Sequence, residues 1–210
     1  MTAVSTPSEN AAHRDTIRPM RTIGKVTITL LVGSAILVSG QEKPLSSDNK
    51  YYEEQLQALK ENPIGNLRSE GVTQSYRLVW LRTFHHPVVV RIDVLPDGTG
   101  RVYIKETSGQ GGYEPGKLIK NDARKLTAQQ TQWFVDRMRE SGFWELSSNE
   151  RQAENEIVLD AATWVVEGKM GDQYHVVERY APKCSDKVRN IGLMMLLDMA
   201  KLKLLYDEVY

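Results

Sequence analysis

Residues 164–180, WVVEGKMGDQYHVVERY, contain side chains that could carry out acid–base chemistry. Glu167 and His175 are close in sequence, and Asp160 comes shortly before them. A carboxylate beside an imidazole is a common arrangement for general acid–base catalysis, provided that the two groups come within hydrogen-bond distance. A hydrolase built on this chain would therefore use His175 together with Glu167 or Asp160.

The same residues also have the pattern of a β-hairpin, because two apolar runs flank turn-forming residues. A two-residue turn at Met170-Gly171 would pair Val166 with His175. It would place His175 on the face of Trp164, and Glu167 on the opposite face. A three-residue loop would instead pair Glu167 directly with His175. Turn chemistry favours the first register, so we predict a structural hairpin without a histidine–carboxylate pair.

Other motifs match functional patterns only in part. The sequence GGYEPGK at 111–117 resembles a phosphate-binding loop, but Leu118 replaces the magnesium-binding Ser or Thr, and Pro115 removes a backbone donor. We therefore predict a flexible loop there. His85 and His86 are neighbours on a predicted strand and would point to opposite faces, so we predict no metal site and no cofactor.

Composition excludes further classes of function. The 210 residues contain 27 basic and 27 acidic side chains, and this balance argues against nucleic-acid binding, which requires a basic face. The single cysteine, Cys184, excludes an intrachain disulfide and a thiolate metal cage. We expect Cys184 to be a small buried residue and not a reactive thiol.

The N-terminal part has the layout of an export signal. Residues 20–40 contain two cations, an apolar stretch from Val26 to Val38 and then small residues, as in a secretory signal peptide. Gln41 stands where a lipoprotein would carry its cysteine. We predict cleavage after Gly40 and a periplasmic or secreted protein, with an inner-membrane anchor at 23–40 as the alternative.

Residues 1–19 are polar and make an unusually long leader. Either they are a disordered leader before a misassigned start, with Met20 as the true first residue, or they are a cytoplasmic tail on an uncleaved anchor. The first interpretation is favoured because the apolar stretch is short for a membrane-spanning helix. Contact with the membrane is expected only through an uncleaved signal segment.

The remaining chain divides into two parts. Residues 41–72 are predicted to form a linker and a short peripheral helix, and 73–210 a single α+β domain. Residues 74–84 and 87–95 are expected strands. After them, LPDGTG predicts a three-residue loop with glycine in the left-handed conformation, which pairs Ile92 with Val102. The next strand follows, and residues 118–126 could form one more.

Two longer helices follow from capping and periodicity. Thr127 and Gln130 form a predicted capping box, with Gly142 where that helix would end. Ser185 is the predicted cap of a C-terminal helix, and Leu193 to Leu197 should make this the most buried helix. The sequence therefore predicts an antiparallel sheet of five or six strands with both helices packed on one face.

Residues 160–182 resemble part of a family. Asp160, Trp164, Glu167, Tyr174-His175 and Pro182, followed by a Leu/Met-rich helix, are similar to the C-terminal half of small uncharacterised exported or lipid-anchored bacterial proteins. These often read D-G-x-x-W-x-x-E, then Y-H-x-V and an aromatic-Ser-Pro. This chain differs at Ala161, at Ala181 and in lacking a lipobox cysteine. The resemblance implies a bacterial envelope protein and carries no catalytic assignment.

We therefore expect a non-enzymatic binding module of the bacterial envelope, such as an immunity-like protein, with an unknown protein as its partner. The predicted binding surface is the strand face that carries Arg77, Arg91, Arg101 and Tyr103, because Arg and Tyr are enriched in interfaces. The alternative function is a periplasmic hydrolase that uses His175.

Overall fold

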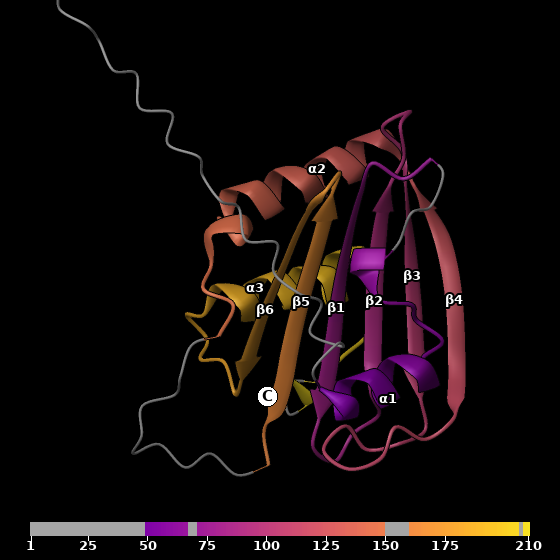
Figure 1. Ribbon diagram of the computed structural model, residues 1–210, viewed down its shortest axis with the longest axis vertical. Coiled ribbons are helices and arrows are strands. Elements are labelled where there is room, and N and C mark those ends of the chain that lie inside the picture. The colour runs from indigo at the N-terminus through magenta and orange to yellow at the C-terminus, as the bar shows by residue number, and fades with distance from the viewer. Residues whose placement is uncertain (1–48, 67–70, 150–159, 206–207) are drawn as a thin grey trace, which may run out of the picture. The chain divides into compact units, whose positions relative to one another are not determined.

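The computed structural model describes residues 49–66, 71–149, 160–205 and 208–210 (Figure 1). They form a six-stranded sheet with the order β4-β3-β2-β1-β5-β6, in which all neighbours are antiparallel. The predicted α+β fold is therefore confirmed. The strands are β1 Gln74–Arg82, β2 Val88–Val94, β3 Gly100–Thr107, β4 Leu118–Leu126, β5 Ala162–Met170 and β6 Gln173–Tyr180.

The helices lie on both faces of this sheet. They are α1 Lys50–Ala58, α2 Ala128–Glu140 and α3 Lys187–Leu193, which continues into the π-helical turn η4 Met194–Met199; η2 Ile64–Asn66 and η3 Phe143–Glu145 are short 3₁₀ turns. In Figure 1, α1 lies in front of the sheet, and α2 and α3 lie behind it. The predicted leader and signal peptide, 1–40, fall outside the described residues. Within the described part, no helix is long and apolar enough to cross a membrane.

Alternation along the strands produces two separate cores. The larger one, on the face of α2 and α3, contains Trp80 and Trp164 from adjacent strands, with ring centroids 5.2 Å apart, and Phe134 from α2. The smaller core, on the α1 face, contains Val79, Leu81, Val89, Val165 and Val176 from the sheet and Tyr52, Leu56 and Leu59 from α1 and its end. The helix expected to be peripheral thus closes the second core.

The β2–β3 hairpin has the predicted geometry. Ile92 pairs with Val102, and Leu95 and Thr99 enclose the three-residue loop through a hydrogen bond of 2.8 Å from the Leu95 amide to the Thr99 carbonyl. Gly98 adopts φ +79°, a conformation that costs glycine little. The three-residue loop was predicted because it keeps the apolar side chains of both strands on one face. The observed register has this property.

The predicted N-terminal cap is confirmed for α2 and wrong for α3. Thr127 and Gln130 form the predicted capping box of α2, and Gly142 follows its end with φ +69°. In α3, however, the cap is Asp186 and not Ser185, because its carboxylate accepts the Val188 amide at 2.7 Å. The following turn is a π-helix. Leu197 within it is exposed, so the segment 193–197 is not buried all round.

The β5–β6 hairpin has a register that differs from both registers considered above. Met170 pairs with Gln173, so the turn is Gly171-Asp172, with Gly171 at φ +57°. His175 consequently lies opposite Gly168, two residues from the favoured Val166. A shift of two residues leaves each side chain on the same face of the strand. His175 and Glu167 therefore still lie on opposite faces, as predicted.

Candidate functional site

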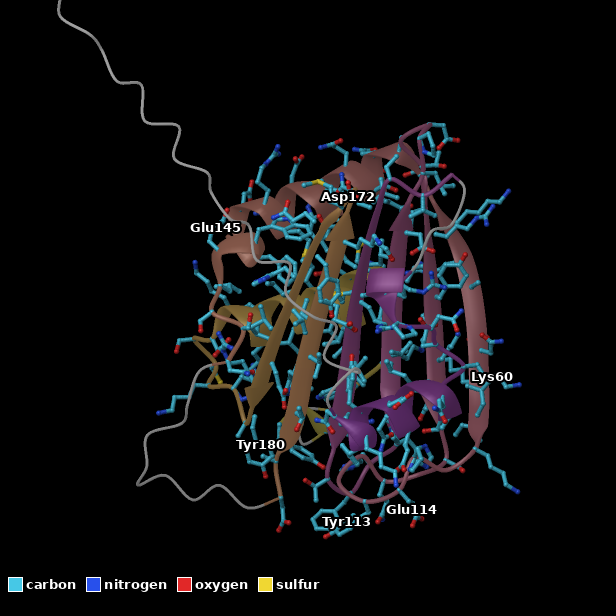
Figure 2. All side chains as sticks on the ribbon, in the orientation of Figure 1. Lys60, Tyr113, Glu114, Glu145, Asp172 and Tyr180 are labelled. Atoms are coloured by element: carbon cyan, nitrogen blue, oxygen red, sulfur yellow. The ribbon has the colours of Figure 1, made fainter. Side chains whose placement is uncertain are left out.

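The three side chains of the hydrolase hypothesis do not come together. His175 packs on the larger core, with its ring centroid 5.1 Å from that of Phe143. Glu167 points to the opposite face, where it contacts Tyr52 of α1. Asp160 is exposed just before β5, whereas His175 is opposite Gly168, about 20 Å along β5 from its first residue, Ala162. Figure 2 shows Asp172 and Tyr180 at the two ends of this hairpin.

Glu167 is instead held in a buried hydrogen-bond network. One carboxylate oxygen accepts the Tyr52 hydroxyl at 2.8 Å and Nε of Arg77 at 2.7 Å, and the other accepts the Tyr174 hydroxyl at 2.8 Å. Both carboxylate oxygens are therefore occupied, and 1% of the Glu167 side chain is exposed. A carboxylate with these partners holds other groups in place and is not free to accept a proton from a substrate.

The predicted Arg/Tyr binding surface is largely covered. Glu167, Arg77, Arg91 and Tyr103 occupy paired positions across β5, β1, β2 and β3, so they form one row on the α1 face. Arg77 is completely buried, and its Nη1 donates to the Asn62 carbonyl at 2.6 Å. The residues of this row share a face, as predicted, but most of the row is enclosed beneath α1 and the segment after it.

Arg91 and Tyr103 are engaged with each other and with neighbouring side chains. The Arg91 guanidinium lies 4.2 Å from the centre of the Tyr103 ring and pairs with Glu61 at 3.1 Å and Asp93 at 2.6 Å. Only Arg101 of the predicted set is exposed. A surface in which one of four residues is accessible does not have the exposed aromatic and arginine anchors typical of an interface.

Glu61, just beyond α1, connects these groups into one ion network. It contacts Arg77, Arg91 and Lys105, the last with a distance of 2.5 Å between Nζ and Oε1. The members of the α1 ion network are Glu61, Arg77, Arg91, Asp93, Lys105 and Glu167. Three basic groups thus balance three acidic ones, and each charge has an opposite neighbour, as buried ions require.

The electrostatics of this network favour charged Arg77 and neutral Tyr52. Burial opposes the charge on Arg77, but the carboxylate of Glu167 more than compensates and raises the pKa of Arg77 above its usual value. Burial, reinforced by the negative charge of Glu167, raises the pKa of the Tyr52 hydroxyl well above 10.0. Tyr52 therefore acts as a hydrogen-bond donor to Glu167 over the whole physiological pH range.

A second feature, on the other side of the sheet, has the character of a binding site. Two adjoining hollows of about 300 and 410 Å³ lie between α2 on one side and α3, η4 and β4 on the other, and both are lined by Trp133 and Asp198. We call them together the helix groove. Its lining residues are Arg124, Leu126, Gln129, Gln130, Trp133, Arg137, Glu140, Ser141, Lys187, Asn190, Ile191, Met194, Asp198, Met199 and Lys201.

Trp133 stands between the two hollows and is 39% exposed. Next to it, Met199 and Ile191 supply buried apolar surface. Concave apolar surface with a few polar groups around it is the usual form of a binding site. The buried apolar stripe of α2 contains Phe134 and Met138. The sequence feature that could have pointed to Trp133 is its place directly before Phe134, which puts a large aromatic side chain on the polar face of the helix.

Two further sequence features, the GGYEPGK loop and Cys184, do not form a functional site in the structure. In the GGYEPGK loop, the amides of Gly111 and Gly112 donate to the carbonyls of His85 and Thr83, at 3.0 and 3.1 Å. These hydrogen bonds join the loop to the β1–β2 turn, and two amides that a phosphate would need are occupied. Cys184 is exposed, which corrects its predicted burial, because it lies in the connection before α3.

The two neighbouring histidines point to different partners. Nδ1 of His85 lies 2.6 Å from the Tyr210 hydroxyl, and Nδ1 of His86 lies 3.0 Å from a carboxylate oxygen of Glu106. Among the residues that the structure describes, no three histidine, cysteine or carboxylate side chains are grouped to hold a metal ion.

No protein-family model matches this sequence, and no curated protein matches it. The family resemblance of residues 160–182 therefore stays a prediction, and the helix groove is the candidate site that the geometry supports best.

Proposed function

We propose that this chain is a non-enzymatic protein-binding module of the bacterial envelope and that the helix groove is its binding site. The observation that carries the proposal is Trp133, an exposed indole set between two hollows with an apolar lining. Tryptophan is strongly enriched among the residues that dominate binding energy, particularly where it lies beside a well-packed pocket. Placement in the envelope rests on the predicted signal peptide at 20–40.

The opposite face of the sheet, beneath α1, is less suited to binding a partner than the helix groove. Because Arg77 and Glu167 are buried in the α1 ion network, a partner could reach them only if α1 left the sheet. Removing α1 would expose the smaller core together with paired charges, which is energetically costly. The groove, in contrast, is open in the structure as it stands.

Site-specific photo-crosslinking in living cells tests this proposal. A photoreactive phenylalanine derivative at position 133 should form one discrete crosslinked product of defined mass, identified as a protein by mass spectrometry. The same derivative at position 113, where Tyr113 is 59% exposed in the β3–β4 loop, is the control and should not form that product. Identical products from both positions, or none from position 133, would contradict the proposal.

A further inference from the structure

We propose that the helix groove binds an acidic segment of its protein partner, with apolar side chains on both sides of Trp133 and carboxylates toward the two ends. This inference rests on the function proposed above. It is carried by the charges of the groove, which differ from those of the chain as a whole.

The charges around the groove are predominantly basic. Four lining residues are basic and two are acidic. Arg137 and Glu140 neutralise each other, since Nη1 and Oε2 are 2.7 Å apart on the same helix. Arg124, Lys187 and Lys201 then remain against Asp198, in a chain whose overall charge is zero. Potentials of opposite sign favour specific association, so an acidic partner is preferred.

The arrangement of these charges also matters. Arg124 and Lys201 line one hollow and Lys187 the other, whereas Asp198 and Trp133 line both. Basic groups therefore lie toward both ends, and the middle is apolar with one carboxylate. A bound segment should carry its own acidic residues at the ends and apolar residues in the centre, because a central carboxylate would face Asp198.

Arg124 contributes a specific acceptor preference. Arg124 lines one hollow, and its pairing with Val102 places it on the groove side of β4. A guanidinium donates to a carboxylate through charge-assisted hydrogen bonds, which are about twice as strong as hydrogen bonds to a neutral group. This difference favours a carboxylate over a neutral polar group at that end.

Binding of designed peptides to the full mature chain tests the inference. The probe is a labelled helical peptide with glutamate pairs at both ends and two leucines one turn apart in the centre. Its twins carry lysine in place of every glutamate, or alanine in place of both leucines. We expect the acidic peptide to bind at least about tenfold more tightly than either twin, measured by fluorescence anisotropy.

Charge reversal locates the binding. Arg124→Glu with Lys187→Glu should weaken the acidic peptide about tenfold and improve the lysine twin. The matched control is Lys125→Glu with Lys117→Glu, which changes the total charge equally. Lys125 is the neighbour of Arg124 on β4 but lies on the opposite face, and both control lysines are exposed. The control variant should bind like the unmodified protein, and circular dichroism of both variants should confirm that they are folded.

Each other outcome has a definite meaning. Equal or tighter binding of the lysine twin overturns the acidic preference, as does an equal effect of the control variant. No binding of any peptide also overturns the inference about the partner, and the crosslink at position 133 then decides separately whether the groove is a binding site. Self-association that Trp133→Ala abolishes, measured by light scattering, would make a second copy of this chain the occupant and would overturn it too.

Discussion

At the scale of single residues, Glu167 shows how the same sequence feature can have two meanings. Its position near His175 suggested catalysis, whereas the fold places it against Arg77 and Tyr52. The sequence was sufficient to predict that His175 and Glu167 lie on opposite faces, because alternation along a strand is a local property. It could not indicate that Tyr52 and Glu61 complete the buried site, because these contacts join α1 and the segment after it to the sheet, and Tyr52 lies 115 residues before Glu167.

Removal of the Glu167 charge should destabilise the protein strongly. Glu167→Gln leaves the buried guanidinium of Arg77 without its closest counter-ion, and breaking a buried pair costs about 3 kcal/mol or more. Urea unfolding followed by tryptophan fluorescence measures the change. Arg101→Ala, on the same face but exposed, is the control and should change the free energy of unfolding by less than about 0.5 kcal/mol. Similar losses in the two variants would contradict the role of the network.

Removal of the Glu178 charge should stabilise the protein, in contrast to removal of the Glu167 charge, and the gain should depend on pH. Burial raises the pKa of its carboxyl above the usual 4.5, so the charged form destabilises the folded state at neutral pH. Its favourable contribution is complete below pH 4.5 and is lost as the pH rises through the folded-state pKa. Glu178→Gln should therefore raise the melting temperature slightly at pH 7, and this gain should shrink as the pH falls toward 4. A gain that is independent of pH would argue against this cause.

At the scale of the elements, the sequence predicted best where local rules act alone. The capping box of α2 depends on a few adjacent residues, and the β2–β3 loop on the alternation of apolar residues in two adjoining strands; both were confirmed. The β5–β6 turn was predicted wrongly, since Met170-Gly171 and Gly171-Asp172 are both acceptable turns and only pairing along the whole hairpin selects between them. The C-terminal helix was predicted from the spacing of its apolar residues, and that spacing did not indicate the π-helical turn Met194–Met199.

Gly192 provides a test of how α3 packs on the sheet. A Cβ at this position would overlap carbon atoms Cε3 and Cζ3 of the buried Trp164 ring, so α3 would have to move away from β5. Gly192→Ala should lower the free energy of unfolding by about 1–3 kcal/mol, the usual cost of overpacking. Asn190→Ala on the same helix, where the side chain is exposed, should have little effect. Chemical denaturation of the two variants measures the difference.

At the scale of the whole molecule, the export hypothesis makes a direct prediction about the chain in the cell. If residues 20–40 are a cleaved signal peptide, the protein purified from a periplasmic extract should begin at Gln41. N-terminal sequencing or intact mass measures this. A chain that retains residues 20–40 and sediments with the membrane would instead favour the anchor at 23–40, and a full-length chain in the soluble cytoplasmic fraction would contradict both.

The two outer strands of the sheet have a consequence for how the protein behaves at high concentration. An unpaired strand can recruit the same strand of another molecule and begin aggregation. On β4, most side chains are exposed, and Lys120, Asp122, Arg124 and Lys125 place charge on both faces. On β6, the amide of Glu178 already donates to the Ser148 carbonyl at 2.8 Å, which occupies part of that border. Both borders thus discourage strand exchange between copies of the protein at high concentration.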